Sequence, residues 1–394
     1  MRMRRVTDDI YWLGAIDWDR RLFDGFVPLP DGTSYNCYLV RGSEKTALID
    51  TVDPSRWDEL RSNLREVPNL DYVVINHVEQ DHSGSLPFVL DRYPNAKVLC
   101  TAKARSMLVE HLAIDAERVM TVEDGKTVSL GSKTLRFIFT PWVHWPETMC
   151  TYVEEDRGLF SCDMFAAHLA SSDLFAGGRE CVIEEAKRYY AEIMMPFASQ
   201  IARHLEKLSR LEIKWIATSH GPVYDQPAAI MAAYRDWAVG GPKNLVLLLS
   251  ISMHGSTQKM VEHLVGELVH RGVDVQPFDM SSADIGKVMT ALADAATLVI
   301  ATPTVLGGPH PNIASAAFTV NQLKPKTKYL AIIGSYGWGG HAVDQLKQLM
   351  SGVKAEMLDP VLCRGLPADA DYAALSALAD TIAARHRELD AKGA

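Results

Sequence analysis

Beyond residue 243, short and almost wholly apolar runs alternate with amphipathic stretches of helical period. Apolar runs of this length, bounded by turn residues, are typical of buried parallel strands. They predict strands over 244–251, 273–278, 297–301, 329–334 and 354–361, and helices over 258–271, 283–294, 340–351 and 371–389. This alternation indicates a doubly wound parallel α/β sheet, which binds ligands beyond the carboxyl ends of its strands.

The preceding residues follow a different pattern. Short segments predict strands over 10–13, 34–40, 46–50 and 72–75, a helix over 55–65, and more short strands between 97 and 162. Strands and helices mixed in this way indicate a mixed-sheet α/β sandwich. The segment 237–243 (WAVGGPK) ends a helical pattern with two glycines and a proline, which are strong breakers. The sequence therefore predicts two domains, over 1–242 and 243–394.

Composition and charge narrow the class of protein. Of 394 residues, 47% are hydrophobic and 23% charged, as in globular proteins. The net charge of −9 disfavours a nucleic-acid partner. Neither a membrane-spanning apolar run nor a signal segment is apparent, so no membrane partner is expected. The six cysteines form no C-x-x-C pair, which predicts a reducing, cytoplasmic location and no cysteine-ligated iron module in this chain.

The most informative segment, 77–84 (HVEQDHSG), directly follows the predicted strand 72–75. Four potential metal ligands lie inside this segment, over the six residues 77–82. Three more each lie in a short loop after an apolar strand. The seven are His77, Glu79, Asp81, His82, His144, Asp163 and His220. Together they supply four histidines and three carboxylates, enough for two metal ions that share one bridging carboxylate.

Each outlying candidate also has a purely structural interpretation. His144 lies between two tryptophans and fits a core histidine. Asp163 fits a helix cap, and His220 before Gly-Pro fits a turn. The metal hypothesis depends on the three converging with the 77–82 segment.

The ligand pattern resembles that of the metallo-β-lactamase superfamily, in which His-x-His-x-Asp-His is followed by His, Asp and His. Here Glu79 replaces the second histidine. A carboxylate at that point favours a harder, redox-active iron pair over zinc, and the changed pattern resembles the flavodiiron proteins. The resemblance assigns His77, Glu79 and His144 to one iron, Asp81, His82 and His220 to the other, and Asp163 as the bridge. In some family members the histidine equivalent to His82 is turned away from iron.

Three loops of the second half each follow an apolar strand and fall at one edge of the predicted sheet. The first comprises Ser252, Met253, His254, Gly255, Ser256 and Thr257. The second contains Pro303, Thr304, Val305, Leu306 and Gly307. The third comprises Ser335, Tyr336, Gly337, Trp338, Gly339 and Gly340. None matches G-x-G-x-x-G or the P-loop motif, which disfavours a dinucleotide or a hydrolysed nucleotide.

The chemistry of these loops suits a flavin. Backbone amides at a helix start, with three hydroxyls, can cradle one phosphate, and Trp338 offers an aromatic face. The structural alternatives are a helix-capping turn at 252–257 and a Trp338 that packs against the core. The loops resemble those of short-chain flavodoxins, which implies that 252–257 binds the FMN phosphate while 303–307 and 335–340 flank the isoalloxazine.

Both halves together resemble two-domain flavodiiron proteins over essentially the whole chain. The segment 14–18 (GAIDW) and the pair His144-Trp145 add to the likeness, whereas Phe26 departs from relatives with a tyrosine near the diiron pocket. The implied fold is a metallo-β-lactamase-like αββα sandwich followed by a flavodoxin-like doubly wound parallel sheet. The implied cofactors are FMN and two non-haem irons.

The implied activity is reduction of dioxygen to water, of nitric oxide to nitrous oxide, or of both. Reduction of one dioxygen molecule to water takes four electrons, two from the ferrous ions and two from reduced FMN. Coupling two nitric oxide molecules to nitrous oxide takes only two electrons. The motifs therefore fit either gas. Electrons would come from an external donor such as rubredoxin, a flavin reductase or a soluble deazaflavin.

In the family, flavin and iron are too far apart within one subunit for fast electron transfer. A head-to-tail homodimer, alone or as a dimer of dimers, is therefore implied. Two other functions stay open on sequence grounds: a zinc hydrolase of the metallo-β-lactamase type with a flavodoxin-like regulatory domain, and a non-catalytic flavoprotein electron carrier.

Overall fold

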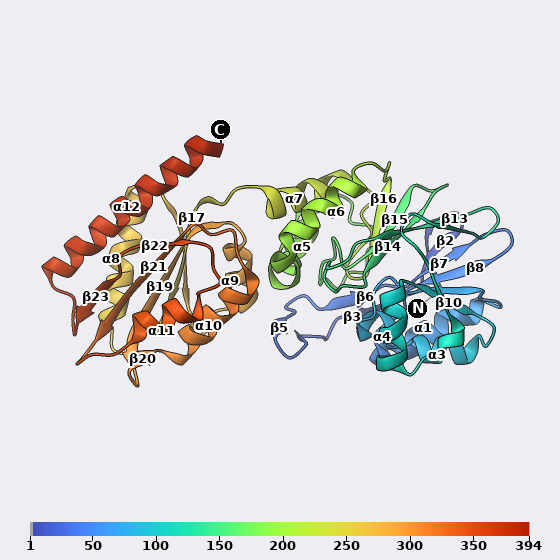
Figure 1. Ribbon diagram of the computed structural model, residues 1–394, viewed down its shortest axis with the longest axis horizontal. Coiled ribbons are helices and arrows are strands. Elements are labelled where there is room, and N and C mark those ends of the chain that lie inside the picture. Colours follow the sequence, from blue (N-terminus) through green and yellow to red (C-terminus); the bar gives the residue numbers. More distant parts are fainter. Residues whose placement is uncertain (1–2, 394) are drawn as a thin grey trace. The chain divides into compact units, whose positions relative to one another are not determined.

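The computed structural model describes residues 3–393 and contains two compact units. The first runs up to Tyr190 and resumes over Phe197–Val239; the second comprises Ala191–Pro196 and the chain from Gly240 onward. Figure 1 shows the elements of each unit in chain order, from blue to red. Among the described residues, no helix combines the length and the apolar character needed to cross a membrane.

The first unit contains two main sheets. The first sheet comprises β1 (Arg4–Thr7), β2 (Ile10–Trp12), β7 (Tyr38–Arg41), β8 (Thr46–Ile49), β9 (Tyr72–Val74), β10 (Lys97–Cys100) and β11 (Val119–Thr121), in that order. The second comprises β12 (Thr127–Ser129), β13 (Thr134–Phe139), β14 (Met149–Val153), β15 (Gly158–Cys162) and β16 (Trp215–Thr218). Two small ribbons pair β3 (Ala15–Asp17) with β6 (Thr33–Tyr35), and β4 (Leu22–Phe23) with β5 (Val27–Pro28).

Apolar side chains from both sheets form one core, in which Val40 and Ile49 of the first sheet pack with Phe137 and Phe160 of the second. The helices are α1 (Trp57–Asn63), α2 (Gln80–Ser83), α3 (Leu86–Arg92), α4 (Ala102–Leu112), α5 (Glu180–Tyr189), α6 (Ala198–Leu208) and α7 (Pro227–Val239). Figure 1 shows α1, α3 and α4 beside the first sheet and α5–α7 beside the second. The unit is thus an α/β sandwich of two sheets between helices.

Parallel pairing places the metal-ligand loops at matching strand ends. The strands β8, β9 and β10 pair in parallel, as do β15 and β16. Because parallel strands end at the same edge of a sheet, the loop after β9 lies at one edge with its neighbours, and the loops after β15 and β16 lie together.

The predicted strand 34–40 is wrong as a single element. It forms β6 and β7, which lie in different sheets and are separated by Asn36-Cys37. The buried Asn36 amide donates to the carbonyls of Thr218 and Gly221, at 2.9 and 2.7 Å. Because the Asn36 side chain is hydrogen-bonded to the loop after β16, the backbone here does not continue a regular β-ladder, and the strand ends.

The second unit has one sheet, in the order β18 (Asp274–Asp279), β17 (Lys243–Ser250), β19 (Ala295–Val305), β21 (Tyr329–Tyr336) and β22 (Glu356–Met357). The strand β23 (Val361–Arg364) also pairs with β21. These pairings are parallel, and β20 (Gly308–Pro309) adds an antiparallel edge to β19. The helices are α8 (Ser256–His270), α9 (Ile285–Leu292), α10 (Pro311–Leu323), α11 (Ala342–Leu349) and α12 (Asp369–Gly393). The doubly wound sheet predicted from the pattern is present, with helices on both faces (Figure 1).

Three details of this unit differ from prediction. The strand predicted to end at 301 continues to Val305, because it folds back on β20 through Leu306 and Gly307, both with positive φ, as tight hairpin turns require. The helix α10 was not predicted. The predicted strand 354–361 is two short strands, β22 and β23, and the second ends at Arg364.

Candidate metal centre and flavin-binding loops

All seven predicted metal ligands converge in the first unit. Ligand atoms of His77, Glu79, His144 and Asp163 lie within 4.8 Å of one another. A second group comprises Asp81, His82 and His220, and Asp163 also joins His82 and Cys162 in a third. The structural alternatives for His144, Asp163 and His220 therefore do not describe where these side chains point.

Asp163 lies between the two groups, directly after β15. Its Oδ2 is 3.5 Å from His77 Nε2 and 3.3 Å from His144 Nε2. Its Oδ1 is 3.1 Å from His82 Nε2 and 3.7 Å from His220 Nε2. Each oxygen of one carboxylate thus faces a different pair of histidines, which is the arrangement that a bridging ligand requires.

Each group also has its own carboxylate. Glu79 Oε2 is 3.1 Å from the Nε2 atoms of both His77 and His144. Asp81 places Oδ1 3.2 Å from His82 Nε2 and Oδ2 3.1 Å from His220 Nε2. The ring of His82 is therefore directed into the cluster rather than away from it.

Burial differs across the cluster. The side chains of His77, Asp81, His82, Asp163 and His220 are at most 4% exposed, whereas Glu79 is 16% and His144 is 13% exposed. Solvent and small molecules therefore reach the cluster from the side of Glu79 and His144. Within the described chain, both carboxylate oxygens of Asp81, Oδ2 of Asp163 and both ring nitrogens of His82 lack a hydrogen-bond partner. Buried polar atoms without partners are rare, and a bound cation would satisfy them.

Neighbouring charges in the cluster strongly shift one another's pKa values. Burial opposes protonation of His82, but the carboxylates of Asp163 and Asp81 prevail and raise its pKa to about 9. For Asp163, burial favours the neutral acid, yet the histidines around it hold its pKa well below the usual range. Without metal, protons on histidine thus compensate the carboxylate charge. A divalent cation can replace those protons.

The loop that carries the first four ligands is held by residues that the sequence analysis did not single out. Asp50, which ends the predicted strand 46–50, accepts hydrogen bonds from the backbone and side-chain amides of Asn76, at 2.7 and 2.9 Å. Burial raises the pKa of Asp50 to about 6. Thr51 donates from its backbone and its hydroxyl to the carbonyl of His82, at 2.7 and 2.6 Å. The sequence signal was an aspartate directly after a buried strand.

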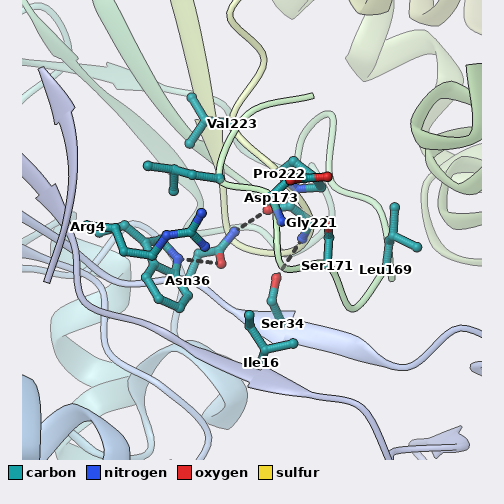
Figure 2. A pocket seen from close by; sticks show the side chains of 12 residues that line it. Arg4, Ile16, Ser34, Asn36, Leu169, Ser171, Asp173, Gly221, Pro222 and Val223 are labelled. Carbon is teal, nitrogen blue, oxygen red and sulfur yellow. Dashed lines mark hydrogen bonds between the residues drawn. The ribbon is translucent and has the colours of Figure 1, made fainter. Parts of the chain in front are cut away.

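The loop that carries His220 is fixed from behind. The Gly221 amide donates to Ser34 Oγ at 2.8 Å, and the Gly221 carbonyl accepts from the Asn36 side chain at 2.7 Å. These three residues line the small pocket shown in Figure 2. His220 Nδ1 lies 2.6 Å from the carbonyl oxygen of Ser34. Gly221 has φ of +82°, and a Cβ there would come 2.8 Å from the carbonyl oxygen of Ala167. This position therefore requires glycine.

One buried histidine beside the cluster was also missed. His168 is 4% exposed, its ring centroid lies 4.6 Å from that of His220, and its Nδ1 is 2.9 Å from Thr33 Oγ1. Burial and the neighbouring His220 lower its pKa well below the usual value, so the ring is neutral. Its position in a run of apolar residues gave no signal of a second role.

In the second unit, the predicted flavin loops line a cavity of about 320 Å³. The cavity is bounded by Ser252, Met253, His254, Ser256, Thr257, Pro303, Thr304, Ser335, Tyr336, Gly337, Trp338 and Gly365. The hydroxyls of Thr257 and Ser335 lie 2.9 Å apart and join the first loop to the third. Ser252 Oγ accepts from the backbone amides of Gly255 and Gln258, at 3.1 and 3.2 Å.

The first loop ends at a helix start suited to an anion. Gly255, with φ of +87°, caps α8 and has no side-chain acceptor to offer the first amides of the helix. A Cβ at Gly255 would meet no atom within 4 Å, so the space in front of the helix is open. Phosphate groups bind at such helix starts.

Trp338 does not pack against the core, because its side chain is 95% exposed at the rim of the cavity. Leu306, at the tip of the β19–β20 hairpin, is fully exposed, and Met253 is 51% exposed. The structural alternative for Trp338 is therefore wrong, and the flavin loops present an apolar rim.

Some predicted flavin residues lie outside this cavity. Gly339 and Gly340 line a neighbouring cavity of about 350 Å³, which also includes His341. Gly255, Val305, Leu306 and Gly307 line neither cavity. Gly365 was missed because the last strand was predicted to end at 361, whereas β23 ends at Arg364 and places Gly365 at the same sheet edge.

Comparison with known proteins gives a consistent assignment. Residues 33–221 match the family model described as ODP family beta lactamase, and residues 248–377 match that of flavodoxin. A nitric oxide reductase of Moorella thermoacetica is 37% identical, with 90% of each chain covered. The rubredoxin-oxygen oxidoreductase of Megalodesulfovibrio gigas is 32% identical, with 100% of this chain and 99% of the relative covered.

The solved structure of the flavodiiron protein from Giardia intestinalis superposes with a TM-score of 0.94 at 29% identity, covering 100% of this chain and 99% of that one. The predicted order of a metallo-β-lactamase-like and a flavodoxin-like domain is thus confirmed. With relatives this similar along nearly its full length, the chain belongs to the flavodiiron protein family.

Proposed function

We propose that the seven converging side chains hold two iron ions and that the protein reduces dioxygen, nitric oxide or both at them. The observation that carries this proposal is Asp163, whose two oxygens face two different groups of histidines. His77, Glu79 and His144 would hold one ion. Asp81, His82 and His220 would hold the other.

The chemistry of the donors supports iron. Each position offers two imidazoles and one carboxylate besides Asp163, a mixed nitrogen and oxygen set that suits a non-haem iron pair. Among the described residues only one cysteine, Cys162, joins the cluster, beside Asp163. Zinc–thiolate sites typically use two or more cysteines, so the donor set does not match that type of site.

The flavin loops support FMN in the second unit. The open helix start at Gly255 and the hydroxyls of Ser252, Ser256 and Thr257 would hold its phosphate, and Trp338 would cover the ring. When bound, reduced FMN and two ferrous ions supply the electrons for gas reduction. The protein's own part is to hold the ligands, keep His168 neutral beside them, and leave Glu79 and His144 accessible to the gas.

Electrons would enter at the apolar rim of the flavin cavity, formed by Met253, Leu306 and Trp338. An exposed apolar rim around a redox group suits a weakly bound protein donor. The 394 residues contain no cysteine cluster that could serve as the donor, and a rubredoxin or a flavin reductase would fit this role. We place the domain boundary at 242/243 and the protein in the cytoplasm, where its six free cysteines would stay reduced.

A head-to-tail homodimer, alone or as a dimer of dimers, would bring the flavin of one chain to the irons of the other. Exposed aromatic side chains in loops next to the metal cluster support this. Trp142, two residues before His144, is 49% exposed, and Phe26, in the hairpin whose Phe23 contacts His220, is also 49% exposed. Exposed apolar groups of this size commonly become buried on assembly.

Substituting Glu79 by alanine tests the proposed chemistry. Protein purified without oxygen is expected to contain two irons per chain, and E79A to lose iron and at least about 100-fold in gas reduction, because a direct ligand is removed. Iron content is measured by metal analysis, and oxidation of reduced flavin and iron is followed anaerobically with each gas in turn. The matched control is E110A, which removes an exposed carboxylate on α4.

Each rival function has its own outcome in this experiment. Two zinc ions per chain would indicate a hydrolase. Gas reduction that survives the loss of iron in E79A would overturn the mechanism. A protein that exchanges electrons with its donor but reduces neither gas would be a carrier.

Iron affinity is expected to rise with pH. The pKa of His82 is about 9 in the metal-free protein, so below that pH the metal must displace its proton, whereas Asp163 is already ionised. The apparent affinity for ferrous iron should increase by about tenfold per pH unit for each proton displaced. Anaerobic titration of the apoprotein against a chelator measures it. The slope of H111A, which removes an exposed histidine, should match wild type; a pH-independent affinity in the wild type would contradict the assignment.

Mixed dimers test the assembly. E79A removes the metal site, and S256D places a negative charge where the FMN phosphate would bind while retaining a good residue for a helix start. In a head-to-tail dimer, a mixed pair contains one intact flavin opposite one intact iron site, so mixing two inactive variants should restore activity. Steady-state gas consumption is measured after subunit exchange. No recovery despite proven mixed dimers, or full wild-type activity in a monomer, would refute the arrangement.

A further inference from the structure

The loop between β13 and β14 reaches the metal cluster twice. It carries His144, and three residues later Glu147, which is 2% exposed. Glu147 Oε1 lies 2.7 Å from His77 Nδ1 and also accepts from the backbone amide of Val78, at 3.0 Å. Glu147 is not among the seven candidate ligands, yet it contacts one of them directly.

This contact fixes the protonation of the His77 ring. Glu147 Oε1 accepts the hydrogen bond of the Val78 amide, and this same oxygen faces His77 Nδ1 as an acceptor. His77 Nδ1 must then carry the hydrogen. Nε2 faces the cluster, where Glu79 Oε2 lies at 3.1 Å and Asp163 Oδ2 at 3.5 Å, and it is the ring nitrogen left to bind a metal.

In the opposite group, neither histidine has a carboxylate hydrogen-bonded to its Nδ1 atom among the described residues. His220 Nδ1 faces the neutral backbone carbonyl of Ser34, at 2.6 Å. Among the described residues, His82 Nδ1 has no hydrogen-bond partner. A histidine that donates to a carboxylate is a stronger base, and hence a stronger electron donor to a metal, than one that donates to a carbonyl.

We propose that Glu147 is a positioning residue that makes the metal position of His77, Glu79 and His144 more electron-rich than that of Asp81, His82 and His220. The inference rests on the proposed diiron site and concerns a difference between its two halves. Consequently, the first position would bind its iron more tightly than the second. The reduction potential of the iron at the first position would also be lower.

The scaffold around Glu147 does not depend on its charge. Met149 donates its amide to the carbonyl of Asn76 at 3.0 Å, and Thr151 donates its hydroxyl to Asn76 Oδ1 at 2.8 Å. The hydroxyl of Thr101 donates to the carbonyl of Glu147, at 3.0 Å. These contacts join the two ligand loops through groups that a substitution at Glu147 leaves in place.

Glutamine at position 147 separates charge from shape. In E147Q the amide oxygen can still accept from His77 and Val78, while the new NH₂ replaces Oε2, which has no hydrogen-bond partner among the described residues. We expect about 10- to 100-fold weaker binding of one of the two irons, the usual effect of losing such a partner. We also expect the reduction potential of that iron to rise towards the other, because a negative charge is lost.

The measurements use the full chain loaded with FMN and iron. Chelator competition gives the two iron affinities, and a redox titration followed by electron paramagnetic resonance gives the potentials and the signal of the half-reduced pair. Unfolding temperature and FMN content show whether E147Q is folded, and E110Q is the matched control for the loss of an exposed carboxylate on α4.

A folded E147Q that changes one affinity and narrows the separation of the two potentials supports the proposal. Unchanged affinities and potentials in E147Q overturn it even if the wild type contains two irons and reduces gas. If E147Q does not fold, E147D provides the second test, because it keeps the charge but shortens the side chain and draws the carboxylate away from His77 Nδ1: a wild-type half-reduced signal there overturns the proposal. A wild type without iron would instead refute the proposed function.

Discussion

The buried carboxylate of Asp163 is the constraint on which the metal centre depends. Its two oxygens face opposite groups of histidines, and the hydroxyl of Ser219 donates to Oδ1 at 2.6 Å, which fixes the orientation of the carboxylate. A buried carboxylate is costly without compensating charge. Here the compensation comes from the surrounding imidazoles, three of which have raised pKa values, and cations can take the place of their protons. The four segments that carry the ligands converge around this one group.

The fold achieves that convergence by placing loops at the ends of parallel strands. The loop after β9 carries four ligands, and the loops after β15 and β16 carry one each. The same rule operates in the second unit, where the ends of β17, β19 and β21 deliver the walls of the flavin cavity. Two unrelated sheets thus use one geometric principle, and the family assignment follows from their order in a single chain.

The sequence predicted the ligand set because strand ends are local features, and the structure brings all seven residues together. It also predicted both fold classes and most strands. It missed what depends on distant partners: Glu147 acts on His77, 70 residues away, and Asp50 acts on Asn76, 26 residues away. The helix α10 was missed because its alanine-rich pattern has little polar contrast, although Pro311 after the capping His310 was a usable signal. The hairpin at 305–308 was read as a loop because its partner strand has only two residues.

The most direct test of the account is a crystal structure of protein prepared without oxygen, with anomalous diffraction recorded on both sides of the iron absorption edge. The account predicts two iron peaks per chain, one beside Oδ1 and one beside Oδ2 of Asp163. It also predicts His77, Glu79 and His144 around the second of these, and Asp81, His82 and His220 around the first. A single peak, zinc in place of iron, or an Asp163 carboxylate that binds only one metal would contradict it.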